Sequence, residues 1–184
     1  MGGLMTANAS VFLYSVSLNG DNEAPPNASP GIGSGTIAYD NVARTLSINV
    51  NFSGLLGNTT AAHIHGATAT PFTGTAGVVL TPGTLPGFPL GVTSGSYSSV
   101  LDLSLATTYP AAYITANGGT TLGAESAITS AIAAGRTYFN VHSTVVGGGE
   151  IRGFLTAVPE PSSLALLALG AIGIATKARR KNRN

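Results

Sequence analysis

The sequence predicts an all-β protein, an immunoglobulin-like antiparallel β-sandwich with one short helix, followed by a short hydrophobic helix near the C-terminus. Apolar and polar residues alternate with a period of two in several segments, and turn-forming residues separate these segments. Only 8% of the 184 residues are charged, so serine, threonine, asparagine and glycine must form most of the wetted surface. We expect three parts: a short stretch over 1–10, the sandwich over 11–157, and a tail over 158–184.

The alternation is clearest over 45–53, where Leu46, Ile48 and Val50 share one face and polar residues occupy the other. This pattern is typical of a half-buried antiparallel strand. Residues 124–134 predict the one short helix, because Glu125 suits a first helical turn and Gly135 suits a helix end. Weaker period-two patterns, which predict further strands in two packed sheets, lie at 12–18, 37–39, 97–103 and 139–141.

The charges are unevenly distributed along the chain. Five of the eight basic residues lie within 177–183, whereas the chain up to position 158 carries three arginines against six acidic residues, a net charge of −3. A mildly acidic body argues against nucleic acid as a partner, because phosphate-backbone binding needs clustered lysine and arginine. The absence of cysteine from the sequence excludes disulfides and thiolate metal sites.

The tail has three parts in a fixed order. Pro159, Glu160 and Pro161 interrupt the strand pattern, an apolar helix is expected over 164–176, and a basic cluster that includes Arg179, Arg180 and Lys181 follows. Twelve apolar residues would span about 18 Å, short of a hydrocarbon core of about 30 Å, which favours a transient membrane segment over a lasting anchor. The alternative is a helix buried in the core, since apolar runs of this length often form buried core helices.

The order Pro-Glu-Pro, apolar helix, basic cluster resembles the PEP-CTERM sorting signal of exported bacterial proteins. The resemblance implies processing by an exosortase-type membrane protease, in organisms that make extracellular polysaccharide. It also implies a cell-surface or extracellular location after transient anchoring in the inner membrane. Export needs an N-terminal signal as well, and Ala7-Asn8-Ala9 has the small-x-small form of a signal-peptidase site, so we expect 1–10 to be a signal-peptide remnant or a disordered start.

Short motifs lie in five stretches of the body, over 18–26, 35–40, 62–66, 138–143 and 149–153. Taken in order, these stretches resemble the CHRD domain, which is named from chordin and also occurs in bacterial secreted proteins. The resemblance implies an immunoglobulin-like β-barrel similar to that of copper/zinc superoxide dismutases, and the family has no settled biochemical activity.

The three histidines of the chain all lie in those stretches. His63 and His65 are two residues apart, so on a strand both would point to one face, and His142 lies on another predicted strand. Three neutral imidazoles with an open position suit zinc or copper, with Glu150 as a fourth ligand or an outer acceptor. The alternatives are that the rings satisfy buried backbone groups, in a network with Asn140, Glu150 and Arg152, or that they line a pocket for another ligand.

Two functions follow from these observations. The first is a non-enzymatic exported protein, with the sandwich as a binding or adhesion module at the cell surface or in the extracellular matrix, where polysaccharide is the expected partner. The second is an exported metal-binding protein centred on the three histidines. We expect no enzyme and no catalytic residues, since the sequence lacks cysteine and a Gly-x-Ser-x-Gly motif.

Overall fold

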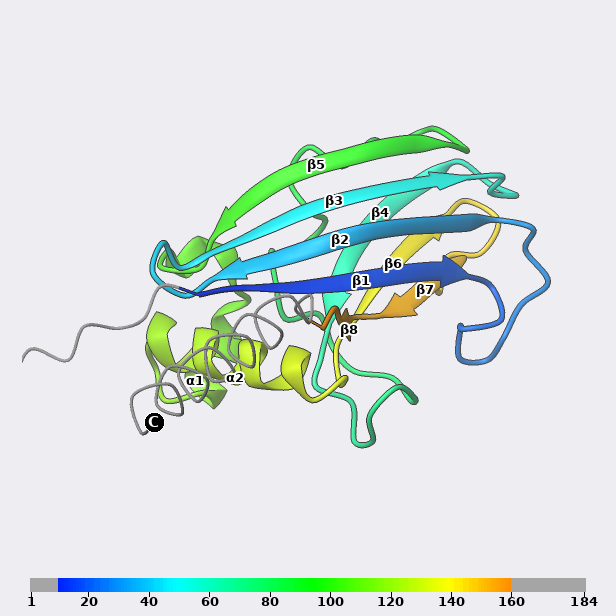
Figure 1. The fold of residues 1–184 in the computed structure, drawn as a ribbon. Helices are drawn as coiled ribbons and strands as arrows, with labels where there is room; N and C mark the ends of the chain where they lie inside the picture. Colours follow the sequence, from blue (N-terminus) through cyan, green and yellow to red (C-terminus); the bar gives the residue numbers. More distant parts are fainter. Residues whose placement is uncertain (1–9, 160–184) are drawn as a thin grey trace, which may run out of the picture.

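The computed structural model describes residues 10–159, in which strands dominate (Figure 1). The predicted N-terminal segment over 1–10, except Ser10, and the predicted helix over 164–176 lie outside the described residues. The elements are, in chain order, β1 (Val11–Asn19), β2 (Ile32–Asp40), β3 (Thr45–Ser53), β4 (Thr59–His65), β5 (Gly95–Asp102), the 3₁₀ turn η1 (Ala106–Thr108), α1 (Ala111–Ala116), α2 (Thr121–Ala133), β6 (Tyr138–Ser143), β7 (Ile151–Phe154) and β8 (Thr156–Ala157).

The strands form one antiparallel sheet in the order β4-β6-β7-β1-β2-β3-β5, and β8 pairs with β1. The sheet curls into a half-barrel, so that the wall of β4, β6 and β7 lies behind the wall of β1, β2, β3 and β5 (Figure 1). The two walls meet where β1 pairs with β7 through Asn19 and Arg152 alone, and this short ladder allows the sheet to turn. The all-β class is confirmed, with the two walls joined in one continuous sheet.

The core fills the space between the two walls. On β3 the predicted alternation is confirmed, because Leu46, Ile48, Val50 and Phe52 are all buried. The opposite wall contributes side chains of the same kind. Those with no exposed surface are Ala62, Ile64, Phe139, Val141 and Ile151. Apolar burial of this kind is the main term that stabilises the fold.

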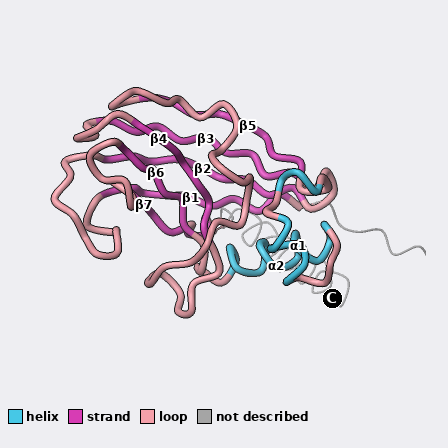
Figure 2. The backbone as a smooth tube through the Cα atoms, turned by 180° about the vertical axis from the view of Figure 1, so that it is seen from behind, coloured by secondary structure: helices cyan, strands magenta, loops and turns pink. Residues whose placement is uncertain are grey.

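The predicted helix over 124–134 is α2, which begins three residues earlier. The Thr120 hydroxyl caps it by accepting a hydrogen bond from the Gly123 N–H at 3.0 Å, and Gly135 ends it at φ +66°. The turn η1 and helix α1 were not predicted, and they lie beside α2 at one end of the sheet (Figure 2). Within residues 10–159, none of the helices is long and apolar enough to cross a membrane.

Glu125 lies beyond the first turn of α2, so it does not have the helix-start role that the sequence predicted. Its carboxylate is buried and accepts hydrogen bonds from Arg44 Nε at 2.6 Å and from the Tyr39 hydroxyl at 2.8 Å. Both partners belong to the β2–β3 hairpin region. Glu125 therefore ties the helix to the sheet by a charge-assisted contact.

We predict that Phe139→Ala lowers the free energy of unfolding by about 3 to 5 kcal/mol, because it empties a fully buried aromatic site between the two walls. The control is Leu122→Ala, which removes a 65% exposed side chain from α2 and should change stability by less than about 0.5 kcal/mol. Chemical denaturation of both variants measures the difference. Equal losses in the two variants would contradict this location of the core.

Candidate metal centre

The three histidines are brought together by the pairing of β4 with β6. In this antiparallel register Ala61 lies opposite His142, and His63 lies opposite Asn140. Ile64 points into the core with no exposed surface, so its neighbours His63 and His65 lie on the other face of β4. The imidazoles therefore converge on the outer side of this wall, as the two-residue spacing predicts.

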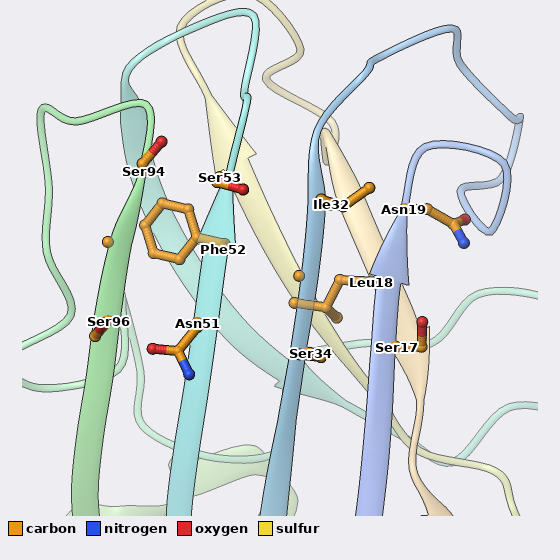
Figure 3. Close-up of a pocket in the computed structure, with 12 residues that line it drawn as sticks. Ser17, Leu18, Asn19, Ile32, Ser34, Asn51, Phe52, Ser53, Ser94 and Ser96 are labelled. Carbon is orange, nitrogen blue, oxygen red and sulfur yellow. The ribbon is translucent and has the colours of Figure 1, made fainter.

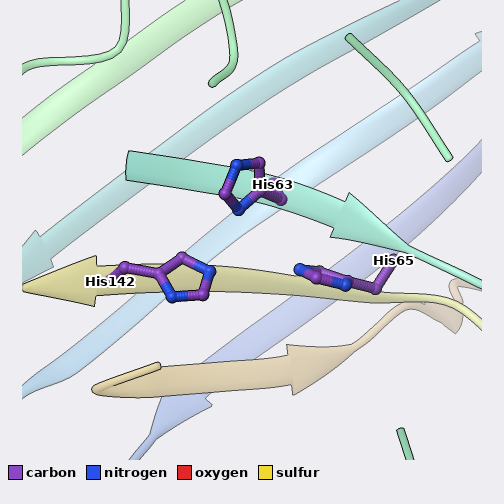
Figure 4. A group of neighbouring side chains, drawn as sticks. All are labelled: His63, His65 and His142. Atoms are coloured by element: carbon purple, nitrogen blue, oxygen red, sulfur yellow. The ribbon is translucent and has the colours of Figure 1, made fainter. Parts of the chain in front are cut away.

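The rings form a compact group (Figure 4). Ring centroids are 4.8 Å apart for His63 and His142, 5.5 Å for His63 and His65, and 6.2 Å for His65 and His142. One nitrogen from each ring lies within 4.8 Å of those of the other two, and all three side chains are half-buried. This arrangement places three potential metal-ligand atoms around one point.

In each ring one nitrogen is already used. His65 Nδ1 donates to the Ala76 carbonyl at 2.9 Å, His142 Nδ1 donates to the Gly147 carbonyl at 3.0 Å, and His63 Nε2 donates to the Gly83 carbonyl. Because a carbonyl oxygen can only accept, these contacts fix the protonated nitrogen of each neutral ring.

The other nitrogen of each ring is buried and has no hydrogen-bond partner among the described residues. These atoms are Nδ1 of His63 and Nε2 of His65 and His142. In a neutral imidazole that nitrogen carries a free lone pair. Three buried lone pairs in one group, each on a ring oriented by a backbone carbonyl, form the arrangement that surrounds metal ions in proteins. The alternative prediction, that the rings only satisfy buried backbone groups, accounts for one nitrogen of each ring.

The charge state of the rings suits a metal ion, and their nitrogens would have to move slightly closer together to bind one. Burial lowers the pKa of His65 to about 4 and also lowers the pKa of His142, so both rings are neutral at neutral pH. A metal bonded to three imidazoles at about 2.0 to 2.1 Å would hold the donor nitrogens about 3.3 Å apart. Binding would therefore draw nitrogens that are up to 4.8 Å apart together by up to about 1.5 Å, within the range of side-chain rotation.

Tyr138 supports His65 in two ways. Its ring stacks on the His65 ring, with centroids 4.8 Å apart and planes 1° from parallel. Its hydroxyl lies 3.3 Å from both the N–H and the carbonyl oxygen of Ala76, the residue whose carbonyl fixes His65. Behind Tyr138, the guanidinium of Arg152 lies 4.7 Å from the ring centroid. The sequence analysis missed this support, since a tyrosine on a strand carries no distinct signal.

Arg152 on β7 belongs to a buried polar group with Asn140 on β6 and Glu23 in the β1–β2 loop. Its Nε lies 3.8 Å from a carboxylate oxygen of Glu23, and the Asn140 amide donates to that oxygen at 3.3 Å. Gly149, which has φ +134°, packs closely against this group. A Cβ at this position would lie 2.6 Å from the Asn140 side-chain oxygen. Burial raises the pKa of Glu23 to about 7, although Arg152 and Asn140 oppose the increase.

The side chain of Glu150 makes hydrogen bonds with loop residues and not with the histidine rings. Its carboxylate is fully buried and accepts hydrogen bonds from the Ser29 hydroxyl at 2.6 Å and from the backbone N–H groups of Leu56 and Gly57. These contacts hold two loops together, so the structure gives Glu150 a loop-anchoring role. Of the predicted sorting residues Pro159 is described, whereas Glu160, Pro161, Arg179, Arg180 and Lys181 lie outside the described residues.

A second feature is a shallow hollow of about 700 Å³ at one end of the outer face of β1, β2, β3 and β5 (Figure 3). The register aligns Ser17, Ser34, Asn51 and Ser96 in one row across these strands, and all four are exposed. None of the residues that line the hollow is charged. They are Ser17, Leu18, Asn19, Ile32, Gly33, Ser34, Asn51, Phe52, Ser53, Ser94, Gly95 and Ser96.

Comparisons with known proteins agree with both sequence resemblances. A family model for the CHRD domain matches residues 14–155, and a model for the PEP-CTERM protein-sorting motif matches residues 157–181. The sorting motif marks an exported protein that its C-terminal tail anchors transiently in the membrane before exosortase processing. No curated protein and no solved structure matches the chain at a significant level.

The raised pKa of Glu23 gives a pH prediction. Between about pH 4.5 and 7 the folded protein binds more protons at Glu23 than the unfolded chain does, so this group's contribution to stability falls as the pH rises through that window. Glu23→Gln cannot ionise. Relative to the original protein, the variant should therefore gain about 2 kcal/mol in unfolding free energy from pH 4.5 to pH 7.5.

Denaturation curves of both proteins across this range test the prediction. All other titratable groups are present in both proteins, so their contributions cancel in the difference. A stability difference that stays constant with pH would show that Glu23 has an ordinary pKa.

Proposed function

This chain belongs to the CHRD domain family and is exported with a sorting tail, and on that premise we propose that it acts outside the cell as a metal-binding protein. Zinc or copper would be held by His63, His65 and His142. The observation that carries the proposal is the set of three buried nitrogen lone pairs within one group, none with a hydrogen-bond partner among residues 10–159.

Leaving these nitrogens unpaired costs free energy. A buried acceptor without a partner costs about 1 to 3 kcal/mol, and here three such atoms lie within 4.8 Å of one another without a compensating bond among the described residues. A metal ion accepts all three lone pairs at once. The carbonyls of Ala76, Gly83 and Gly147 hold the rings in the tautomers that this binding needs.

The ligand set also limits the chemistry. Three neutral imidazoles without a thiolate suit zinc or divalent copper, and an open position would be left for water or a small ligand. The CHRD domain is not a known enzyme family. The whole sequence contains three histidines, too few for the two-metal site of a copper/zinc superoxide dismutase, so we propose binding and not dismutation.

We predict that the full chain binds one Zn²⁺ or one Cu²⁺ per molecule, as measured by isothermal titration calorimetry with each metal alone. Each of His63→Gln, His65→Gln and His142→Gln should weaken binding more than about tenfold, because each removes one lone pair from the group. Binding should also raise the unfolding temperature of the original protein, since the ion binds the folded state.

Two controls make the test specific. Thr60→Ala changes an exposed residue of the same strand β4 and should leave affinity unchanged. Glu150→Gln alters a carboxylate that contacts loops and not the histidine rings, so any effect should be on stability and not on the affinity of the folded protein. Retention of full affinity in a folded triple histidine variant would rule out the proposed site.

A second candidate function is adhesion, which the uncharged hollow on the outer sheet face favours. Serine hydroxyls and asparagine amides in a flat row can pair with sugar hydroxyls, and the lack of charge favours a neutral polysaccharide over an anionic one. We propose that the sandwich binds neutral extracellular polysaccharide at this face. The hollow and the histidine group lie on different walls, so the two functions are compatible.

For this second function we predict that Asn51→Ala weakens binding to the neutral extracellular polysaccharide of the native organism by roughly threefold to tenfold. This loss of affinity corresponds to one or two lost hydrogen bonds. Affinity electrophoresis in gels that contain the polysaccharide measures the change. Asn49→Ala is the matched control, because Asn49 is an exposed asparagine on the same strand that does not line the hollow. Equal retardation of the two variants and the original chain would exclude this face.

A further inference from the structure

We propose that the end of the sheet from which the tail leaves is a membrane-contact surface, which lies on the lipid bilayer while the tail is anchored. We call it the apolar end and define it by Val11, Phe12, Leu13, Val42, Leu105 and Val158. The occupant is a lipid surface, and the contact depends on apolar side chains and not on charge. The inference is independent of the metal site.

The direction of the tail is set by β8. Its residues run antiparallel to β1, with Thr156 opposite Ser15 and Ala157 opposite Tyr14, and the N–H of Val158 then donates to the Leu13 carbonyl at 2.9 Å. The chain therefore leaves the sheet toward the start of β1, and Pro159 helps to line an apolar hollow of about 300 Å³ there.

The length of the connection limits how far this end can lie from the membrane. Five residue steps separate Pro159 from Leu164, where the apolar run of the tail begins. Even a fully extended chain of that length spans at most about 18 Å. Since the tail anchors the protein in the membrane, the start of β1 must stay close to the bilayer surface during that stage.

The side chains at this end are the kind that a bilayer would accept. Val11, Phe12 and Leu13 are 60%, 45% and 42% exposed, three consecutive apolar residues at the surface. The register brings the β2–β3 turn and the end of β5 to the same end of the sheet as Val11. Val11 pairs with Asp40, and Thr45 pairs with both Asp40 and Asp102. Val42 and Leu105 follow those strand ends and are also exposed. Exposed apolar side chains gathered at one end of a domain are typical of a protein or membrane contact.

The charges at the same end indicate that the contact is not electrostatic. Asp40 accepts hydrogen bonds from the N–H groups of Val42 and Ala43, and Asp102 accepts two from Ser104, so both carboxylates hold turns. Arg44 pairs with Glu125. Without a free basic cluster among these residues, anionic lipid should add nothing to binding, and salt should not release the contact.

The experiment uses the full chain inserted in vesicles of phosphatidylethanolamine and phosphatidylglycerol, with an environment-sensitive fluorophore on a single introduced cysteine. The sequence has no cysteine of its own, so labelling is specific. Val11→Cys probes the apolar end. Ile32→Cys is the matched control, because Ile32 is 61% exposed against 60% for Val11 and lies at the opposite end of the sheet. Quenching by spin-labelled lipid is measured at both sites, at low and high salt.

We expect strong quenching at position 11 and several-fold weaker quenching at position 32, unchanged by salt. With the label at position 11, the added change Leu13→Ser should reduce the quenching while circular dichroism shows the fold intact. Equal quenching at both sites would mean that the domain lies flat, and no quenching at position 11 would mean that it stands off the membrane. A blue-shifted but unquenched label would mean that protein, such as a second copy, covers this end. Each of these three results would overturn the proposal.

Discussion

The pairing of β4 with β6 is the constraint on which the candidate site depends. Successive strand residues alternate between faces, so burying Ile64 in the core forces His63 and His65 outward together. The same register places His142 beside them, while its neighbour Val141 enters the core. A shift of one residue in this ladder would reverse every side chain, bury the imidazoles and expose the apolar residues. Hydrophobic burial therefore fixes the geometry of a polar site.

Contacts behind the histidines link that site to the rest of the half-barrel. Tyr138 stacks on His65, and Arg152 covers Tyr138. Glu23 lies beside the guanidinium and accepts a hydrogen bond from Asn140. Arg152 also pairs across the junction where the two walls of the sheet meet. The position of His65 thus depends on the closure of the sheet as well as on its own strand. A module with this organisation can keep a binding site rigid without disulfides or a large charged surface.

The sequence predicted the fold class well because alternation is a local signal. The strand over 45–53 and the face shared by His63 and His65 follow from spacing alone. The helix α2 was predicted from residue types, of which Gly135 does end the helix and Glu125 does not begin it. The continuity of the sheet, helix α1 and the partners of Glu150 depend on contacts between distant segments, and no local pattern encodes those. The carbonyls that orient the histidines come from loops, where backbone atoms act and side-chain identity carries little information. Both family resemblances were confirmed, because family models match residues 14–155 and 157–181.

We propose that the three unpartnered nitrogens bind one metal ion in the exported protein. The most direct measurement is X-ray absorption at the zinc and copper edges, on protein collected from outside the cells of its native organism without added metal. We expect one metal per chain, with three nitrogen neighbours at about 2.0 Å that show the scattering pattern of imidazole rings. A protein that is folded, exported and free of bound zinc and copper would contradict it.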